Sequence, residues 1–190
     1  MKKGYGGAGT TTARFGGTIG TADALYGALS PGQPAAGAPA LDRRLLAGRT
    51  AAEIIDAVIA AVQPGDGTLD ADASRASIKD ALSELLVKFP DADLLDLSEE
   101  QREFTIERFV AADVFQLYGL DIGKTIHEKA PSARTALRRL REVRDYIKEA
   151  MAARFRALRA AGQTLSDGQV KRFVQAVLLE TFQVFEHYTE

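Results

Sequence analysis

Three segments of this chain begin in the same way, with a serine or threonine followed three residues later by glutamate or glutamine. The pairs are Thr50 with Glu53, Ser98 with Gln101, and Ser166 with Gln169. In such a capping box each side chain binds a backbone N–H that the first turn of a helix leaves unpaired. Apolar residues then recur at helical spacing, as they do over residues 54–62. No segment shows the alternating pattern of a strand, so the sequence predicts an all-α protein.

The apolar periods and the helix-breaking residues predict an irregular bundle of about six helices. A short helix is expected over residues 22–29, and the longer ones after Thr50, over 73–89, from Ser98 to Gly119, over 133–161 and after Ser166. A further short segment, 41–47, is predicted to end at Gly48, and Gly162 is predicted to end the longest helix. Residues 120–130 are expected to be rich in turns.

The N-terminal part differs in composition from the rest. Residues 1–20 are rich in glycine and threonine and have no sustained apolar period, so burial does not offset the entropy of ordering them. We therefore predict a flexible, disordered tail over residues 1–20. A short helix and a Pro/Gly linker are expected over 21–40, and a helical domain over 41–190.

Several kinds of site are excluded or unsupported. The chain has no cysteine and only two histidines, His127 and His187, which lack the spacing of metal ligands. The glycines at 4–9 follow no strand, and those at 119–123 are one residue too close for a phosphate loop. No apolar run approaches the roughly 18 residues of a membrane span. We expect a cytoplasmic protein without a cofactor, a metal or a catalytic site of its own.

Charge is unevenly distributed along the chain. Between Asp66 and Glu100 there are ten acidic and three basic residues, whereas residues 133–161 contain nine basic and three acidic ones. The predicted basic surface consists of Arg138, Arg139, Arg141 and Arg144. It could bind nucleic acid or an acidic protein partner, since arginine suits bidentate contacts with phosphate and carboxylate. It could equally stay solvated or pair with the acidic segment.

Two blocks of sequence carry a family resemblance. One is FGGTIGTADALYGAL at residues 15–29, and the other comprises DIGKTIHEKAPSARTALRRLREVRDYIKEAMAARFRAL and VLLETFQVFEHY within residues 121–188. In these blocks the chain resembles the QatB-like proteins of bacterial Qat anti-phage defence systems. The resemblance implies a non-enzymatic protein that binds a QueC-like enzyme, encoded in an operon with an ATPase and a TatD-like nuclease.

The resemblance also implies where the working part lies. The N-terminal segment would be presented to the QueC-like enzyme, with conjugation of a deazapurine-type base to a terminal glycine as the reaction. The residues expected to serve modification or partner binding are Gly4, Gly6, Gly7, Gly9, Phe15, Gly16, Gly17, Leu25 and Tyr26. This chain begins Met1-Lys2-Lys3-Gly4, so conjugation to a glycine would require trimming before Gly4. The alternative function is a helical nucleic-acid-binding protein that uses the arginine-rich segment 133–161.

Overall fold

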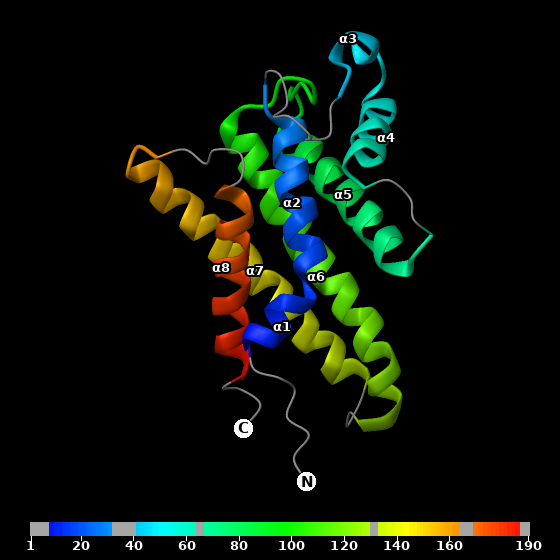
Figure 1. The fold of residues 1–190 in the computed structure, drawn as a ribbon, viewed down its shortest axis with the longest axis vertical. Helices are drawn as coiled ribbons and strands as arrows, with labels where there is room; N and C mark the ends of the chain where they lie inside the picture. Colours follow the sequence, from blue (N-terminus) through cyan, green and yellow to red (C-terminus); the bar gives the residue numbers. More distant parts are fainter. Residues whose placement is uncertain (1–7, 32–40, 64–66, 130–132, 164–168, 187–190) are drawn as a thin grey trace.

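The computed structural model describes residues 8–31, 41–63, 67–129, 133–163 and 169–186, and these ranges contain eight helices and no strand (Figure 1). The helices are α1 (Ala8–Arg14), α2 (Gly16–Leu29), α3 (Arg43–Leu46), α4 (Ala51–Val62), α5 (Leu69–Lys88), α6 (Glu99–Lys129), α7 (Ala133–Ala160) and α8 (Gln169–Glu186). The predicted all-α class is confirmed, and the number of helices is somewhat larger than expected. None of the helices in these ranges is long and apolar enough to cross a lipid bilayer.

The long helix α6 is the centre of the bundle, with α2, α5 and α7 packed along it. Contacts between Ser74 and Asp113 and between Glu84 and Arg108 show that α5 runs antiparallel to α6. α8 packs against α7 and α2, and the short helix α1 lies across the lower end of α8 (Figure 1). The two ends of the described chain therefore meet at one end of the molecule.

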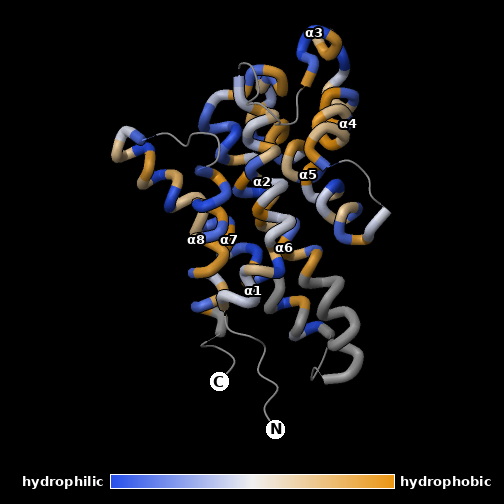
Figure 2. Tube along the Cα trace, in the orientation of Figure 1, coloured by the Kyte–Doolittle hydropathy of each residue, from blue (hydrophilic) through white to orange (hydrophobic). Residues whose placement is uncertain are grey.

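The core consists of the apolar stripes that the periodicity predicted. Figure 2 shows the hydrophobic residues of the helices in orange, interspersed with hydrophilic ones in blue. One connected cluster includes side chains from α1, α2, α4, α5, α6, α7 and α8. Its large, fully buried members include Leu25, Tyr26, Ile78, Leu82, Leu85, Ile106, Phe109, Ile147, Met151 and Leu178.

Two of the predicted capping boxes are present. The Glu53 N–H donates to the Thr50 hydroxyl (3.3 Å) and the Thr50 N–H donates to the Glu53 carboxylate (2.9 Å). Ser98 and Gln101 make the same reciprocal pair of hydrogen bonds at the start of α6. The third pair includes Ser166, which lies outside the described residues.

Two of the three predicted glycine helix ends are confirmed. Gly48 and Gly162 have positive φ angles of 77° and 65°. After α7, the N–H groups of Gly162 and Gln163 donate to the carbonyls of Arg159 and Leu158, which is the Schellman arrangement. The third prediction is wrong, because α6 continues through Gly119 to Lys129. A glycine within a helix costs only about 1 kcal/mol relative to alanine, and the turn-rich segment expected at 120–130 is helical over its described residues.

The prediction of a disordered tail over residues 1–20 is wrong from residue 8 onward. Residues 8–14 form α1, and α2 begins at Gly16 rather than at residue 22. Burial of Phe15 and Ile19 in the common core offsets the entropy cost of the glycines. Residues 1–7 and the predicted Pro/Gly linker at 32–40 lie outside the described residues. α5 also begins earlier than predicted, at Leu69, with Thr68 as its N-cap.

Candidate functional site

The N-terminal helix α1 is attached to α8 through an aromatic contact. The ring of Phe15 stacks on that of Phe182, with the ring centroids 5.3 Å apart and an interplanar angle of 27°. Phe15 is only 5% exposed, and Ala8, at the start of α1, is also buried. Within α1, the Thr12 hydroxyl donates to the Ala8 carbonyl (2.8 Å). The point from which residues 1–7 extend is therefore held against the body of the protein.

A buried carboxylate joins α2 to α5 and α6. Asp113 of α6 accepts a hydrogen bond from the Thr18 hydroxyl (2.6 Å) on one oxygen and from the Ser74 hydroxyl (2.8 Å) on the other. Its side chain is fully buried, and this burial raises the pKa of Asp113, while the hydroxyl donors act in the opposite direction. The cluster fixes α2 at one position along α6.

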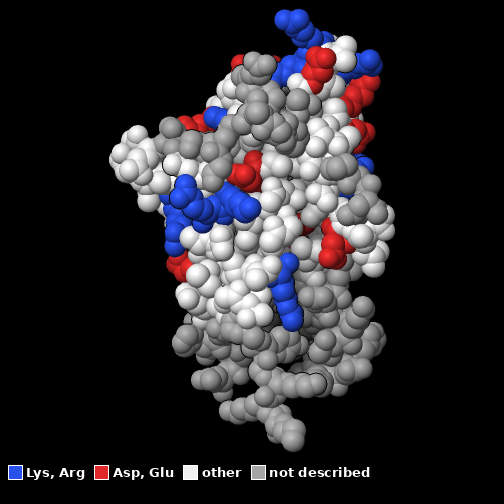
Figure 3. Space-filling view, viewed as in Figure 1, with Lys and Arg blue, Asp and Glu red and all other residues white. Residues whose placement is uncertain are grey.

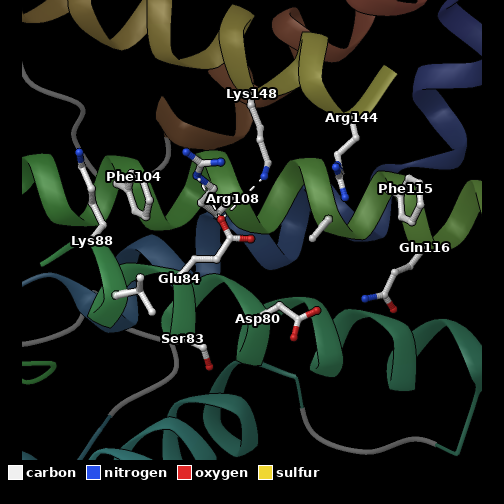
Figure 4. A pocket seen from close by; sticks show the side chains of 12 residues that line it. Asp80, Ser83, Glu84, Lys88, Phe104, Arg108, Phe115, Gln116, Arg144 and Lys148 are labelled. Carbon is white, nitrogen blue, oxygen red and sulfur yellow. Dashed lines mark ion pairs between the residues drawn. The ribbon is translucent and has the colours of Figure 1, made fainter. Parts of the chain in front are cut away.

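A groove of about 780 Å³ lies between α5, α6 and α7 (Figure 4). Its floor is a stripe of α6 in which Phe104, Arg108, Ala112 and Phe115 recur every three or four residues. Figure 4 shows the α5 side chains, including Glu84, on one side of this stripe and those of α7 on the other. The groove was not predicted from the sequence, although the spacing of its four floor residues is visible there.

The groove contains more basic than acidic groups. The Glu84 carboxylate lies between two cations, 3.5 Å from Arg108 Nε and 3.7 Å from Lys148 Nζ (Figure 4). Arg108 and Arg144 lie over the rings of Phe104 and Phe115, 4.7 and 5.2 Å from the ring centroids. Because the arginines cover the aromatic faces, the groove offers positive charge above an apolar floor.

A family model described as Qat anti-phage system associated protein QatB matches residues 6–185. This match includes all eight helices except the last residue of α8. The chain belongs to the QatB family. The resemblance noted from residues 15–29 and 121–188 is thereby confirmed, and the chain is a component of the Qat anti-phage system. No curated protein and no solved structure matches the chain significantly.

Two of the residues that the QatB resemblance suggested for partner binding lie in the core. Leu25 and Tyr26 are 0% and 1% exposed. The guanidinium of Arg102 lies 4.8 Å from the centroid of the Tyr26 ring and donates to the Ser30 hydroxyl (2.6 Å). In this fold both side chains are buried where α2 packs in the core, so they do not form part of the exposed surface. Phe15 is likewise buried and acts as an anchor of α1.

The glycines of α1 and α2 have a different environment. Gly9, Gly16 and Gly17 are exposed, and a Cβ atom added to any of them would meet no other group within 4 Å. None of the three has a positive φ angle. Within the described residues, neither the packing nor the backbone therefore requires glycine at these positions. The visible face of the molecule over α1 and α2 also carries few charged side chains (Figure 3). Gly4, Gly6 and Gly7 lie outside the described residues.

The predicted basic surface on α7 is not one continuous patch. Arg138 is exposed and pairs with Glu142 of its own helix at 3.7 Å, whereas Arg144 turns toward α6 and the groove. The two residues are six positions apart, which places them about 120° apart around a helix. Arg141 is exposed and forms no ion pair with the described residues, and the side chain of Arg139 lies outside what the structure describes.

The acidic segment (66–100) and the basic segment (133–161) form an ion pair with each other, as one of the interpretations of the charge pattern predicted. Glu84 of the acidic segment pairs with Lys148 of the basic one. Farther along α7, Arg154 pairs with Glu180 of α8, and Arg159 with Glu103 of α6. The acids of other helices that pair with α7 thus come from α5, α6 and α8, and two of these three acids lie outside the acidic segment.

Proposed function

We propose that this chain is a non-enzymatic adaptor of the Qat system, which binds a QueC-like partner enzyme and presents its N-terminal residues to that enzyme as a substrate for modification. Membership of the QatB family supports the defence role. The attachment of α1 to α8 supports the presentation of the N-terminal segment, because a substrate segment is captured more readily when its base is held in place.

The observation that carries this proposal is the anchor formed by Phe15 and Phe182. It places residues 8–20, which were predicted to belong to the presented segment, in the folded body, so that the segment available to a partner ends at Ala8. Seven fully extended residues span at most about 25 Å. To act on Gly4, Gly6 or Gly7, a partner must therefore bring its active site within that distance of Ala8, near α1 and the neighbouring end of α8.

The exposed glycines suit such a docking surface. A glycine in the middle of a helix costs roughly 0.5–1 kcal/mol relative to alanine. Gly9, Gly16 and Gly17 lie in the first turns of α1 and α2, and among the described residues nothing would obstruct a Cβ atom there. A partner whose surface approaches the bare backbone closely would explain why glycine is present at these positions. These residues, with Gly4, Gly6 and Gly7 in the preceding segment, are the proposed contact and modification region.

The test is co-expression with the QueC-like protein of the same operon, followed by affinity purification and intact-mass measurement. Wild-type protein should co-purify with the enzyme and carry an added mass that peptide mapping places before Ala8. A variant lacking residues 1–7 should lose the added mass and keep its fold, since the core begins at Ala8. Arg138→Ala, on an exposed part of α7, is the control and should behave as wild type.

The two parts of the proposal fail separately. An unmodified N-terminus in a system that protects against phage would exclude modification. Absence of the enzyme from the purified material at every salt concentration tested would exclude docking.

A further inference from the structure

The groove between α5, α6 and α7 lies on the side of the molecule away from the N-terminal helices. Asp113 marks the side of α6 that faces α2, through its hydrogen bond from Thr18. Phe104 precedes Asp113 by nine residues, which at about 3.6 residues per turn places it half a turn away around the helix. Figure 4 accordingly shows α2, in blue, behind α6 when the groove is in front. A ligand in the groove would leave the α1 surface free.

The positive groups of the groove are partly withdrawn from water. Three of its cations are partly buried: Arg108, Arg144 and Lys148. The electrostatic attraction between an anion and a partly buried cation is stronger than that at a fully exposed site, because less water screens it. Burial lowers the pKa of Lys148, and Arg108 and Arg144 lower it further, against the opposite effects of Glu84 and Asp145. The lining of the groove itself holds four cations and two carboxylates, while Glu107 and Asp145, which lie outside the lining, also pair with Arg108 and Arg144. In addition, Arg108 Nε is buried and lies 3.5 Å from the carboxylates of both Glu84 and Glu107, without a hydrogen bond to the described residues.

The groove also has exposed apolar surface. Val87 on its α5 wall is 83% exposed, the most exposed of the large apolar side chains in the described ranges. Phe104, Ala112 and Phe115 lie in the floor beside it. An occupant would cover this surface only if it carried apolar side chains as well as negative charge.

The charges on the α5 side of the groove favour an acidic peptide over a nucleic acid as the occupant. The α5 wall contributes Asp80, Glu84 and Lys88 to the groove, and the segment from Asp66 to Glu100 to which they belong carries seven more acidic than basic residues. Nucleic acid has a negative charge every few ångströms along its length, so its backbone would be repelled by this wall. A peptide can place carboxylates only where the cations are and apolar groups elsewhere.

From this arrangement we infer that the groove is a second docking site, which binds an acidic amphipathic segment of a partner protein with its carboxylates against Arg144 and Lys148 and its apolar side chains on the α6 floor. Glu84 occupies the place of a ligand carboxylate when the groove is empty, because it already bridges Arg108 and Lys148. The inference does not depend on the proposed role of the N-terminal residues.

The inference is tested by fluorescence anisotropy with the full-length protein and three labelled probes. The first is an amphipathic peptide with leucines at helical spacing and glutamates between them, the second has lysines in place of the glutamates, and the third is a single-stranded oligonucleotide of mixed sequence. We expect the glutamate peptide to bind and the lysine peptide not to bind. Arg144→Glu and Lys148→Glu should each weaken binding about tenfold or more, since each replaces an attraction with a repulsion. Arg172→Glu, an equal change of charge on an exposed position of α8, should change binding little.

A substitution that increases peptide binding gives the more decisive test, because a damaged fold cannot increase binding. Glu84→Gln removes the internal carboxylate and should tighten binding of the glutamate peptide several-fold, whereas Glu180→Gln, the same charge change outside the groove, should not. The inference is overturned if the glutamate peptide fails to bind at low salt, if Arg172→Glu weakens binding as much as Arg144→Glu does, or if the oligonucleotide binds more tightly in an Arg144-dependent way. A variant lacking residues 1–7 should retain peptide binding, which separates this test from that of the proposed function.

Discussion

Glu103 of α6 is a buried carboxylate that should make the stability of this protein depend on pH. Its side chain is 3% exposed and pairs with Arg159 of α7. Burial raises the pKa of Glu103 from 4.5 to about 7, since the attraction of Arg159 only partly offsets the desolvation and the nearby Glu99 and Glu100 add to the rise. In the unfolded chain the same group titrates near its ordinary value of 4.5.

The sign and size of the effect follow from these two pKa values. Below pH 4.5 Glu103 is neutral in both states and costs the fold nothing. As the pH rises from 4.5 to 7, the unfolded chain loses its proton first, so stability falls by about 1.4 kcal/mol per pH unit. Above pH 7 the accumulated cost reaches at most about 3 kcal/mol.

Replacing Glu103 with glutamine removes this titration while keeping the shape of the side chain. Glu103→Gln should have the stability of the wild type near pH 4 and exceed it by up to about 3 kcal/mol at pH 8. Urea denaturation followed by circular dichroism at several pH values measures the difference. Glu180→Gln is the matched control, because Glu180 also pairs with an α7 arginine but is exposed, and its effect should stay below about 1 kcal/mol. A difference between Glu103→Gln and wild type that is the same at pH 4 and pH 8 would refute the reasoning.

Three further substitutions test the N-terminal anchor and the bare helix face. Gly17→Ala should raise the free energy of unfolding by roughly 0.5–1 kcal/mol and weaken co-purification of the partner; destabilisation would show that the glycine has a structural role. Phe15→Ala should cost about 3 kcal/mol and expose the α1 amides to hydrogen exchange, and unchanged exchange would argue against the anchor. Asp113→Ala leaves the Thr18 and Ser74 hydroxyls without their acceptor and should cost about 3 kcal/mol in urea denaturation; a loss well below 1 kcal/mol would contradict the role of the cluster.

The parts of the fold that the sequence predicts correctly depend on neighbours along the chain. Thr50 and Glu53 are three residues apart, and Gly162 ends α7 through hydrogen bonds to carbonyls three and five residues earlier. Such interactions need only local geometry, which capping and glycine rules describe well. The apolar periods of α4 and α8 likewise depend only on helical spacing.

The errors arise where distant contacts override local preference. The glycine-rich composition of residues 8–20 favours disorder. However, Phe15 packs on Phe182 and Thr18 donates a hydrogen bond to Asp113, and both partners lie far away in the sequence. The groove was missed for the same reason, because its cations and its floor come from helices whose packing no local rule gives. The side chain of Arg144 could be assigned to this groove only after α7 had been placed against α6.

The buried polar groups of α6 explain how the bundle selects one arrangement. Burial raises the pKa values of Glu103, Glu107 and Asp113, so each of these carboxylates destabilises the fold when it is ionised. An apolar stripe, however, tolerates sliding of one helix along another, whereas the Asp113 oxygens accept from Thr18 and Ser74 in only one register of α2 and α5. That register sets where Ala8 lies, and with it where residues 1–7 leave the body. The cost in stability is therefore compensated by a fixed position for the segment that we propose to be presented to the partner enzyme.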